Sequence, residues 1–439
     1  MTGPEMRRLT IVGGGGFRVP LVYGALLGDR LIDEVVLHDV DHRRLAAIER
    51  VLHAQAAGVA HAPRIVATTD LTSALSGASF VFSAIRVGGL AGRVVDEEVA
   101  LSSGVLGQET VGAGGVSYGL RTVPVADALA RRISLVAPDA WVINFTNPAG
   151  LVTEAMGRHL GDRVIGICDS PSALVRRVLR ASGVASASVS YGGLNHLGWL
   201  TAVSDGKREL LPGLLESPAA VESFEEGRLF GAERLRALGV IPNEYLHYYY
   251  DHDDLVRRER AADETRGAFL LRQQTSVYAD LAGPDPLSAW ERARRQRDAT
   301  YMALEGLGER DDAEGGGYEQ VALELMTAIA RDVPAELILN VRNRGTIAFL
   351  DDDAVVEVPC RVDARGAVPV RAFEVPEHGV ALVKQIKVTE RAVLDAASTG
   401  SRAVAVRAMA GHPLIDSVPL GRELIAEYQR RLPELDYLR

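Results

Sequence analysis

The sequence predicts an α/β protein whose N-terminal half forms a doubly wound parallel sheet and whose C-terminal half forms a second, α+β domain. Short apolar runs alternate with helical patterns up to about residue 186, and the first run leads into four consecutive glycines and a helix. Strands that alternate with helices imply right-handed crossovers and a parallel sheet. From about residue 187 the pattern changes to antiparallel-type strands and long charged helices. We therefore expect a Rossmann-type domain over residues 1–186 and an α+β domain over residues 187–439.

The N-terminal half contains six expected strands, each a short apolar run bounded by turn residues. These strands are Leu9–Val12, Val35–His38, Ile65–Thr68, Phe80–Ile85, Trp141–Phe145 and Val164–Ile167. Helical periodicity predicts helices between them, at Val19–Leu27, Arg43–Gln55 and Leu120–Leu135.

The C-terminal half is expected to begin with two antiparallel strands, Ser188–Tyr191 and Trp199–Val203, around a Gly/Asn/His-rich loop. Residues 243–310 are charged and helical, and Ala313–Gly317 reads as a flexible connection. Further strands are expected at Leu337–Asn340, Thr346–Leu350, Val355–Val358 and Val368–Val370, followed by helices over residues 379–430. The acidic triplet Asp351–Asp353 is expected to be a solvated turn.

The overall charge argues against two classes of partner. The 439 residues carry 48 Lys and Arg against 58 Asp and Glu, a formal charge of −10. Such a surface repels nucleic-acid phosphates and anionic membranes. Only two cysteines occur, and neither a signal-like h-region nor a run of about 20 apolar residues is present. We therefore expect a cytoplasmic protein without structural disulfides.

The glycine-rich turn predicts a dinucleotide site. A strand, a glycine turn and a helix N-terminus place free backbone N–H groups against a pyrophosphate. The second strand ends at Asp39, where a carboxylate can accept hydrogen bonds from the ribose diol of NAD; Asp41 is an alternative, although it also suits a helix cap. A purely structural tight turn would also explain the glycines, because position 18 departs from G-x-G-x-x-G. The candidate cofactor-binding residues are Gly13, Gly15, Gly16, Phe17, Arg18 and Asp39.

Cys168 and His196 are candidate metal ligands. Cys168 follows a strand and precedes a helix that starts near Pro171, with Asp169 or Ser170 as its cap. A thiolate is favoured at a helix N-terminus, although a small buried core cysteine is the alternative. His196 lies in a glycine-rich loop that suits the presentation of a side chain. Cys and neutral imidazole together make a transition-metal site that leaves positions open for substrate oxygens.

Tyr245 begins an aromatic stripe, Tyr245-Leu-His-Tyr-Tyr-Tyr250. Such a stripe is more often core or interface than catalytic. A tyrosine can act as a base where a nearby cation lowers its pKa.

In chain order these segments resemble glycoside hydrolase family 4, the NAD- and metal-dependent 6-phosphoglycosidases and α-galactosidase-like enzymes, which depart from the usual two-carboxylate mechanism. The matching segments are IVGGGG (11–16), RVGGLAGRVVDEE (86–98), GVLGQETVGAGGVSYGLR (104–121), NFTNPAG (144–150), GICDSP (166–171), GLNHLGW (193–199), PNEYLHYYY (242–250) and NVRNRGTIAFLDDDAVVEVP (340–359). The resemblance implies a lactate/malate dehydrogenase-like architecture, with residues 1–186 binding NAD and residues 187–439 serving substrate binding and oligomerisation.

The resemblance also implies roles for individual residues. Cys168 and His196 would hold a divalent metal, expected to be manganese, while Asp169 would protonate the leaving oxygen and Tyr245 would deprotonate sugar C2. Candidate substrate contacts are Arg93, Asn147 and Arg266, the last for an anionic group. Glu109 lies in a well-matched segment without an assigned role.

The implied reaction is hydrolysis through transient oxidation of the sugar. Oxidation at C3 by NAD acidifies the C2–H, elimination expels the C1 oxygen, and the returned hydride restores the cofactor. The expected substrate is a 6-phospho-β-glucoside, with another anionic or unphosphorylated glycoside, such as a sulfonated glucoside, as the alternative.

One departure affects the expected substrate. Phosphoglycosidases of this family usually carry a small hydroxyl residue after the glycine turn, whereas this chain has Phe17-Arg18-Val19-Pro20. Arg18 could neutralise cofactor phosphate or an anionic sugar, or face solvent. A hydroxy-acid dehydrogenase and a non-catalytic NAD sensor are rival classes, which the Cys168, His196 and Tyr245 segments disfavour. By resemblance we expect a homodimer or homotetramer.

Overall fold

The computed structural model describes residues 6–299 and 317–439, and its N-terminal half is the expected doubly wound sheet. Six parallel strands follow one another in the order β3-β2-β1-β4-β5-β6. They are β1 (Arg8–Val12), β2 (Glu34–His38), β3 (Arg64–Thr68), β4 (Phe80–Ser83), β5 (Trp141–Asn144) and β6 (Val164–Gly166). The strand order reverses between β1 and β4, which is where open α/β sheets bind ligands at the carboxyl ends of their strands.

Seven helices connect or follow these strands among the described residues. They are α1 (Val19–Leu26), α2 (His42–Ala56), α3 (Leu71–Leu75), α4 (Gly89–Ser102), α5 (Gly112–Val136), α6 (Ala149–Leu160) and α7 (Ser170–Ala181). Asp41 caps α2 by accepting hydrogen bonds from the N–H groups of Arg43 and Arg44, the role expected of an acidic residue at this position. The expected helix Leu120–Leu135 is the second part of the longer α5.

The strands of the C-terminal half extend the same sheet instead of forming a detached one. They are β7 (Ser188–Leu194), β8 (Leu197–Ser204), β9 (Ile241–Pro242), β10 (Ala335–Arg342), β11 (Val355–Asp363) and β12 (Gly366–Pro369). Strand β10 pairs antiparallel with β6, so the described strands form one sheet of twelve. Because the sheet is continuous, the expected division near residue 186 stays a prediction.

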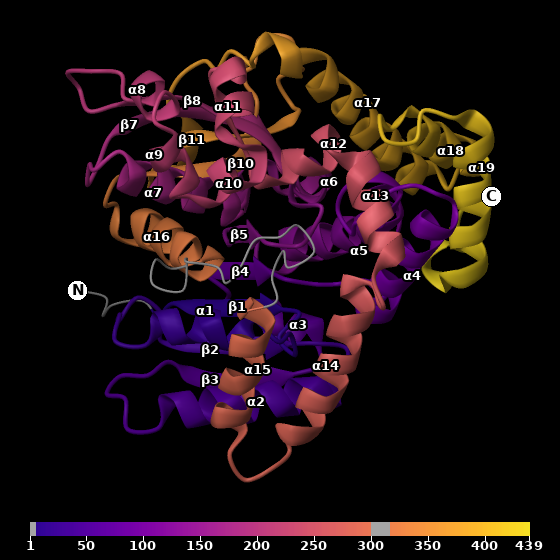
Figure 1. The fold of residues 1–439 in the computed structure, drawn as a ribbon. Coiled ribbons are helices and arrows are strands. Elements are labelled where there is room, and N and C mark those ends of the chain that lie inside the picture. The colour runs from indigo at the N-terminus through magenta and orange to yellow at the C-terminus, as the bar shows by residue number, and fades with distance from the viewer. Residues whose placement is uncertain (1–5, 300–316) are drawn as a thin grey trace.

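The remaining helices lie in three groups along the chain (Figure 1). Four short ones, α8 (Leu211–Leu215), α9 (Pro218–Glu222), α10 (Glu225–Phe230) and α11 (Ala232–Leu238), follow β8. Next come α12 (His247–Tyr250), α13 (His252–Ala261), α14 (Arg266–Asp280), α15 (Pro286–Ala299) and α16 (Tyr318–Arg331). The C-terminal helices are α17 (Glu377–Thr399), α18 (Arg402–Gly411) and α19 (Val418–Arg431).

Helices α14 to α16 bring the C-terminal half of the sequence onto the N-terminal strands. In Figure 1, α14 and α15 descend as a hairpin over the indigo part of the sheet. Helix α15 packs against α2, and α16 packs against α1. Side chains from these late helices therefore reach the first strand-to-helix turn.

Two details of the sequence prediction are resolved near the end of the sheet. The expected strand Thr346–Leu350 was wrong, because this segment forms turns. The buried Asn343 side chain holds it: its amide donates to the carbonyls of Ile347, Leu350 and Asp351, and its oxygen accepts from the N–H of Ile347. These bonds replace a sheet partner. Asp351–Asp353 is exposed, as expected, and Ala313–Gly317 falls almost wholly outside the described residues.

Within the described parts of the chain, no helix has the length and apolar character needed to span a membrane.

Candidate functional site

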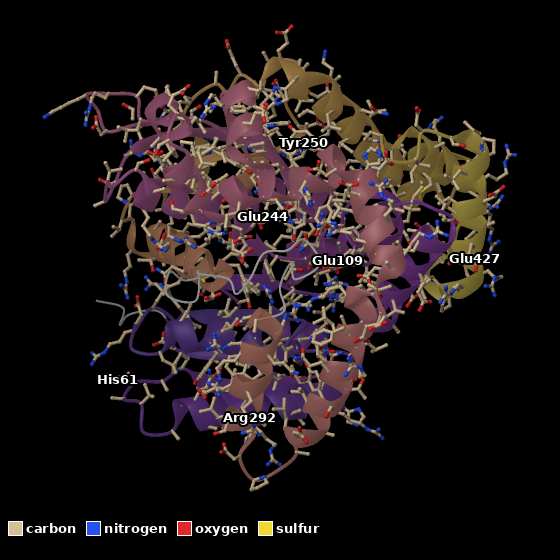
Figure 2. The ribbon with its side chains drawn as sticks, viewed as in Figure 1. His61, Glu109, Glu244, Tyr250, Arg292 and Glu427 are labelled. Carbon is tan, nitrogen blue, oxygen red and sulfur yellow. The ribbon has the colours of Figure 1, made fainter. Side chains whose placement is uncertain are left out.

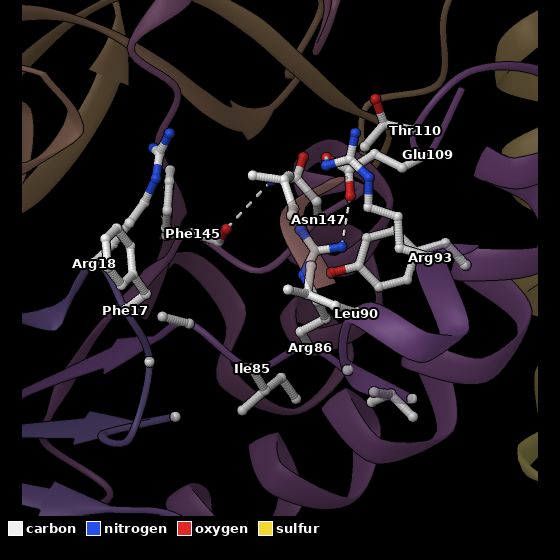
Figure 3. A pocket seen from close by; sticks show the side chains of 18 of the residues that line it. Phe17, Arg18, Ile85, Arg86, Leu90, Arg93, Glu109, Thr110, Phe145 and Asn147 are labelled. Atoms are coloured by element: carbon white, nitrogen blue, oxygen red, sulfur yellow. Dashed lines mark hydrogen bonds and ion pairs between the residues drawn. The ribbon is translucent and has the colours of Figure 1, made fainter. Parts of the chain in front are cut away.

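A cavity of about 1070 Å³ opens at the carboxyl ends of the parallel strands. Its walls come from the turn after β1, the ends of β2, β4, β5 and β6, the β7–β8 turn, and helices α4, α14 and α15. Every candidate site residue except Gly15 lines it directly: Gly13, Gly16, Phe17, Arg18, Asp39, Arg93, Asn147, Cys168, Asp169, His196, Tyr245 and Arg266. The candidate residues chosen from the sequence therefore surround one cavity. Figure 3 shows part of this cavity, with Arg18 and Phe17 facing Arg86, Arg93 and Glu109 across it.

The glycines of the first turn are required by close packing. A Cβ on Gly13 would lie 2.5 Å from the carbonyl oxygen of Ala84, and Gly13 has a φ of +91°. A Cβ on Gly15 would lie 2.9 Å from an Asp39 carboxylate oxygen. Glycine alone allows the strand-to-helix turn to lie this close to its neighbours, as a dinucleotide cradle requires.

One expectation about this turn was wrong. The N–H groups of Gly13 and Gly14 donate to the carbonyl of His38, that of Gly15 donates to Asp39 Oδ2, and that of Gly16 donates to Gly13. The four glycine N–H groups are therefore used inside the protein and do not face a ligand. The turn folds back on β2, so donors for an anion begin after the glycines, beside the N-terminus of α1.

Three aromatic side chains from the late helices hold the carbonyl side of the same turn. Tyr278 donates to the carbonyl of Gly15 at 2.6 Å, and Trp290 donates to that of Phe17 at 2.8 Å. Tyr318 donates to the carbonyl of Arg18 at 2.9 Å. The turn is thus fixed from both sides, and residues more than 260 positions away contribute. No sequence signal pointed to these three residues.

Asn147 lines the cavity and has an unsatisfied side-chain oxygen. The residue follows β5 in the loop before α6, and its Nδ2 lies 3.5 Å from the carbonyl of Phe145. Its Oδ1 is buried with no hydrogen-bond partner among the described residues. Because buried acceptors are almost always satisfied, this orphan oxygen indicates a site for a ligand donor.

Cys168 lies at the end of β6 and is 6% exposed. Burial raises the pKa of its thiol well above the usual value, and the Glu357 and Asp169 carboxylates raise it further. The N–H of Ser170 at the start of α7 lowers the thiol pKa, as expected of a helix N-terminus, but desolvation and the two carboxylates outweigh it. A divalent cation would reverse this balance, since it stabilises a thiolate and compensates nearby carboxylates.

His196 occupies the tight turn between β7 and β8 with a φ of 62°. Burial lowers the pKa of its imidazole to about 4, so the ring is neutral near pH 7 and can serve as a ligand. Across residues 6–299 and 317–439, no group of three or more His, Cys, Asp and Glu could hold a metal. A metal held by Cys168 and His196 would therefore need ligands from elsewhere, which substrate oxygens could supply.

Tyr245 lies directly against His196. The two rings are stacked, with centroids 3.6 Å apart and planes 5° from parallel. Tyr245 stands in the short 3-10 helix Glu244–Leu246, and its N–H donates to Asn243 Oδ1. The aromatic stripe is thus divided: Tyr245 lines the cavity, whereas the Tyr250 hydroxyl accepts a hydrogen bond from Trp199.

Arg93 lies on the cavity wall opposite Phe17 and Arg18, where two carboxylates hold it (Figure 3). Its Nε donates to Glu97 at 2.7 Å and its Nη1 donates to Glu109 at 2.7 Å. Arg86 donates to the other Glu109 oxygen at 2.5 Å. Burial raises the pKa of Glu109, but Arg86 and Arg93 outweigh it and lower the value to about 2. Glu109 is therefore an ionised anchor for two guanidinium groups.

Arg18, Arg266 and Arg297 line the same cavity, and the charges of Arg93 and Arg86 also act on Arg297. Arg266 begins α14 and donates to the carbonyl of Arg297 in α15. The guanidinium groups of Arg18 and Arg297 lie over the rings of Tyr318 and Phe17, at 5.3 and 5.9 Å. Burial and the charges of Arg18 and Arg266 lower the pKa of Arg297 well below its usual value. This concentration of positive charge suits an anionic group, and sequence reasoning missed Arg297.

A buried ionic network lies beneath the turns that carry Asp169 and Tyr245. Ser170 donates to Glu244 at 2.8 Å, and Arg177 in α7 pairs with Glu226 and, at 3.6 Å, with Glu244. Glu244 is fully buried and lies near the middle of the view in Figure 2, whereas Glu427 lies at the edge of the molecule. Asp169 itself takes the N-cap position of α7 without a side-chain cap bond.

The fold and the cavity define an α/β protein of the dehydrogenase type with a charged ligand site at the sheet's switch point. A lactate dehydrogenase from a Medee basin deep-sea metagenome library superimposes with a TM-score of 0.54 at 15% identity, covering 90% of this chain and 100% of that one. This likeness concerns the fold and confirms the expected architecture.

The chain belongs to glycoside hydrolase family 4. The model for the family 4 glycosyl hydrolases matches residues 8–184, and the model for their C-terminal domain matches residues 191–415. A probable 6-phospho-beta-glucosidase of Bacillus subtilis is 32% identical over 370 residues, which cover 82% of this chain and 80% of the relative. A crystal structure of a 6-phospho-alpha-glucosidase from gut microorganisms, in complex with NAD and Mn²⁺, has a TM-score of 0.81 at 28% identity and covers 97% of this chain and 98% of that one.

Proposed function

We propose that this chain hydrolyses a 6-phosphoglucoside, with the β-linked form as the leading substrate, by an NAD- and divalent-metal-dependent oxidation and elimination. The observation that carries the proposal is the convergence of the glycine turn, Cys168, Asp169, His196 and Tyr245 on one cavity. Relatives named as acting on β- and on α-linked phosphoglucosides are about equally similar, which leaves the anomer to experiment.

The residues present fit both cofactors. The glycine turn has the close packing of a dinucleotide cradle, and Asp39, which accepts a hydrogen bond from the Gly15 N–H at Oδ2, would bind the ribose. Cys168 and His196 offer a soft sulfur and a neutral nitrogen, a donor set that suits a transition metal. When bound, NAD would supply a reversible hydride acceptor for sugar C3, and the metal would polarise the C2 and C3 oxygens.

The chain's own residues would then move two protons. Tyr245 would take the proton from C2, and its stacking on His196 fixes the plane from which the hydroxyl approaches. Asp169 would protonate the departing glycosidic oxygen from the start of α7. Asn147 would donate to or accept from a sugar hydroxyl, since its Oδ1 lacks a partner among the described residues. Arg93, fixed by Glu97 and Glu109, would bind the sugar without moving.

The arginines of the cavity support an anionic substrate. Arg18, Arg266 and Arg297 concentrate positive charge in it, and the chemistry shared by a phosphate and a sulfonate is a tetrahedral anion on C6. The glycine turn is followed by Phe17 and Arg18, where phosphoglycosidases of the family usually carry a small hydroxyl residue and then a tyrosine. A sulfonated glucoside is therefore the second candidate substrate.

The test is a panel of nitrophenyl glucosides: neutral, 6-phosphorylated in both anomers, and 6-sulfonated, each with and without NAD and Mn²⁺. The proposal expects turnover of a 6-phosphoglucoside only when both cofactors are present, without net NADH accumulation. Deuterium at C2 should slow turnover or exchange with solvent. Hydrolysis that proceeds with full retention of the C2 label, or that ignores NAD, would exclude the oxidative route.

A further inference from the structure

The segment Gly107–Val111, which carries Glu109, also contacts the proposed metal ligand His196. Thr110 lines the cavity between α4 and α5, and its Oγ1 lies 3.2 Å from His196 Nδ1. A hydroxyl can either donate to or accept from an imidazole nitrogen. The direction of this hydrogen bond decides which ring nitrogen keeps a free lone pair.

Gln108 fixes the direction. Its Oε1 accepts hydrogen bonds from the backbone N–H groups of Thr110 and Val111, the latter at 2.8 Å. Backbone N–H groups only donate, so the atom at this position is the amide oxygen and not the amide nitrogen. The Thr110 hydroxyl lies 3.1 Å from the same oxygen. Because an amide oxygen cannot donate, the hydroxyl proton points to Gln108.

The direction of the Thr110 hydroxyl sets the tautomer of His196. With its proton on Gln108, the Thr110 hydroxyl offers a lone pair to the imidazole, so Nδ1 carries the ring proton and donates it. The neutral ring then has its lone pair on Nε2. The ring cannot easily turn, because His196 sits in a two-residue turn between β7 and β8 and stacks on Tyr245 at 3.6 Å.

We propose that Gln108 and Thr110 are positioning residues that hold His196 in the tautomer whose Nε2 can bind a divalent cation. The proposal rests on the metal site of the proposed function. Ligating histidines generally donate their second N–H to an acceptor that fixes the ring and raises its basicity, and loss of that acceptor costs about 10- to 100-fold in metal affinity. Here the acceptor is a threonine hydroxyl whose own proton is committed to Gln108.

The experiment measures Mn²⁺ and NAD affinity of the full chain by titration calorimetry for the wild type, Thr110→Val and Thr110→Ser. Thr110→Val keeps the shape but removes the acceptor, and we expect its Mn²⁺ Kd to rise about 10- to 100-fold. Thr110→Ser restores the hydroxyl and should return the Kd close to the wild-type value. NAD affinity should be unchanged in both variants, because the glycine turn lies elsewhere in the cavity.

Thr399→Val is the matched control. Thr399 is exposed at the end of α17 and donates to the carbonyl of Asp395, so its loss should leave Mn²⁺ affinity unchanged. A Thr110→Val protein that binds Mn²⁺ like the wild type, or equal losses in Thr110→Val and Thr110→Ser, would overturn the proposal. So would a parallel loss of NAD affinity, which reports a collapsed cavity. A wild type that binds no Mn²⁺ would refute the metal site itself, a distinct failure.

Discussion

The Ser170 hydroxyl donates a 2.8 Å hydrogen bond to the Glu244 carboxylate and so joins the residue after Asp169 to the residue before Tyr245. Both partners are buried, at 2% and 0% exposed. Arg177 pairs with Glu226 and Glu244 and supplies the compensating charge. The proposed acid and base thus stand on two turns that one buried hydrogen bond connects.

Ser170→Ala should lower kcat strongly and destabilise the fold only modestly. A hydrogen bond to a charged group contributes about 1.5–3 kcal/mol, and a misplacement of about 1 Å at a reacting centre can cost about 100-fold in rate. We expect kcat to fall about 10- to 100-fold while NAD and Mn²⁺ affinities hold. Ser182→Ala, at the other end of α7, is the matched control and should retain full kcat. Equal kcat values in the two variants would show that the Ser170–Glu244 bond does not position the acid and base.

Cys168→Ser should abolish metal-dependent turnover and leave the nucleotide site intact. A serine hydroxyl is a poorer ligand than a thiolate for a borderline-soft cation, and the Cys168 thiol lies apart from the glycine turn. We expect Mn²⁺ affinity to fall strongly while NAD affinity, measured by titration calorimetry, stays at the wild-type value. Full activity of the variant after chelation would remove Cys168 from the mechanism.

Tyr278→Phe should weaken NAD binding indirectly, through the glycine turn that Tyr278 holds. The Tyr278 hydroxyl donates to the carbonyl of Gly15 and also accepts from Arg44, so its loss frees the turn that cradles the dinucleotide. A net hydrogen bond is worth about 0.5–1.5 kcal/mol, which corresponds to a rise in the NAD Kd of about 2- to 10-fold. Tyr437→Phe removes a similar hydroxyl, bonded to the carbonyl of Leu120, and should leave the NAD Kd unchanged. If both variants bind NAD equally well, the aromatic contacts serve only stability.

The sequence predicted the features that depend on local patterns. The six parallel strands follow from short apolar runs, and the placement of Asp39 and Cys168 follows from strand ends. Contacts between distant segments left no local signal. Tyr278 and Trp290, which hold the glycine turn, and Arg297, which lines the cavity, were therefore missed. The expectation that the glycine N–H groups face a ligand was wrong for the same reason, because their hydrogen bonds to the end of β2 are a property of the assembled fold. The burial of Cys168 beside Glu357 likewise left no local signal.

Glu109 should make the protein lose stability in acid. Its folded-state pKa is about 2, below the unfolded value of about 4.3. A depressed pKa contributes stability that is complete above about pH 4.3 and is lost as the pH falls toward about 2. Glu109→Gln removes this contribution, so the difference in the free energy of unfolding between wild type and variant should shrink on going from pH 5.5 to pH 3.5. Denaturant titrations at the two pH values measure it. A difference that is constant with pH would contradict the ion pairs with Arg86 and Arg93.

Arg266→Met should raise the KM for an anionic glucoside and leave the KM for a neutral glucoside unchanged. Arg266 begins α14 and lines the cavity, with its guanidinium 5.1 Å from the centre of the Phe269 ring. A charge-assisted hydrogen bond lost to an anion costs about 1.5–3 kcal/mol, or about 10- to 150-fold in affinity. Arg272 is the matched control, since it lies 5.5 Å from the same ring on the same helix but is exposed and paired with Glu264. Arg272→Met should keep the wild-type KM. An equal rise for neutral and anionic glucosides in Arg266→Met would assign Arg266 to general packing, because the loss of an anion contact must depend on the charge of the sugar.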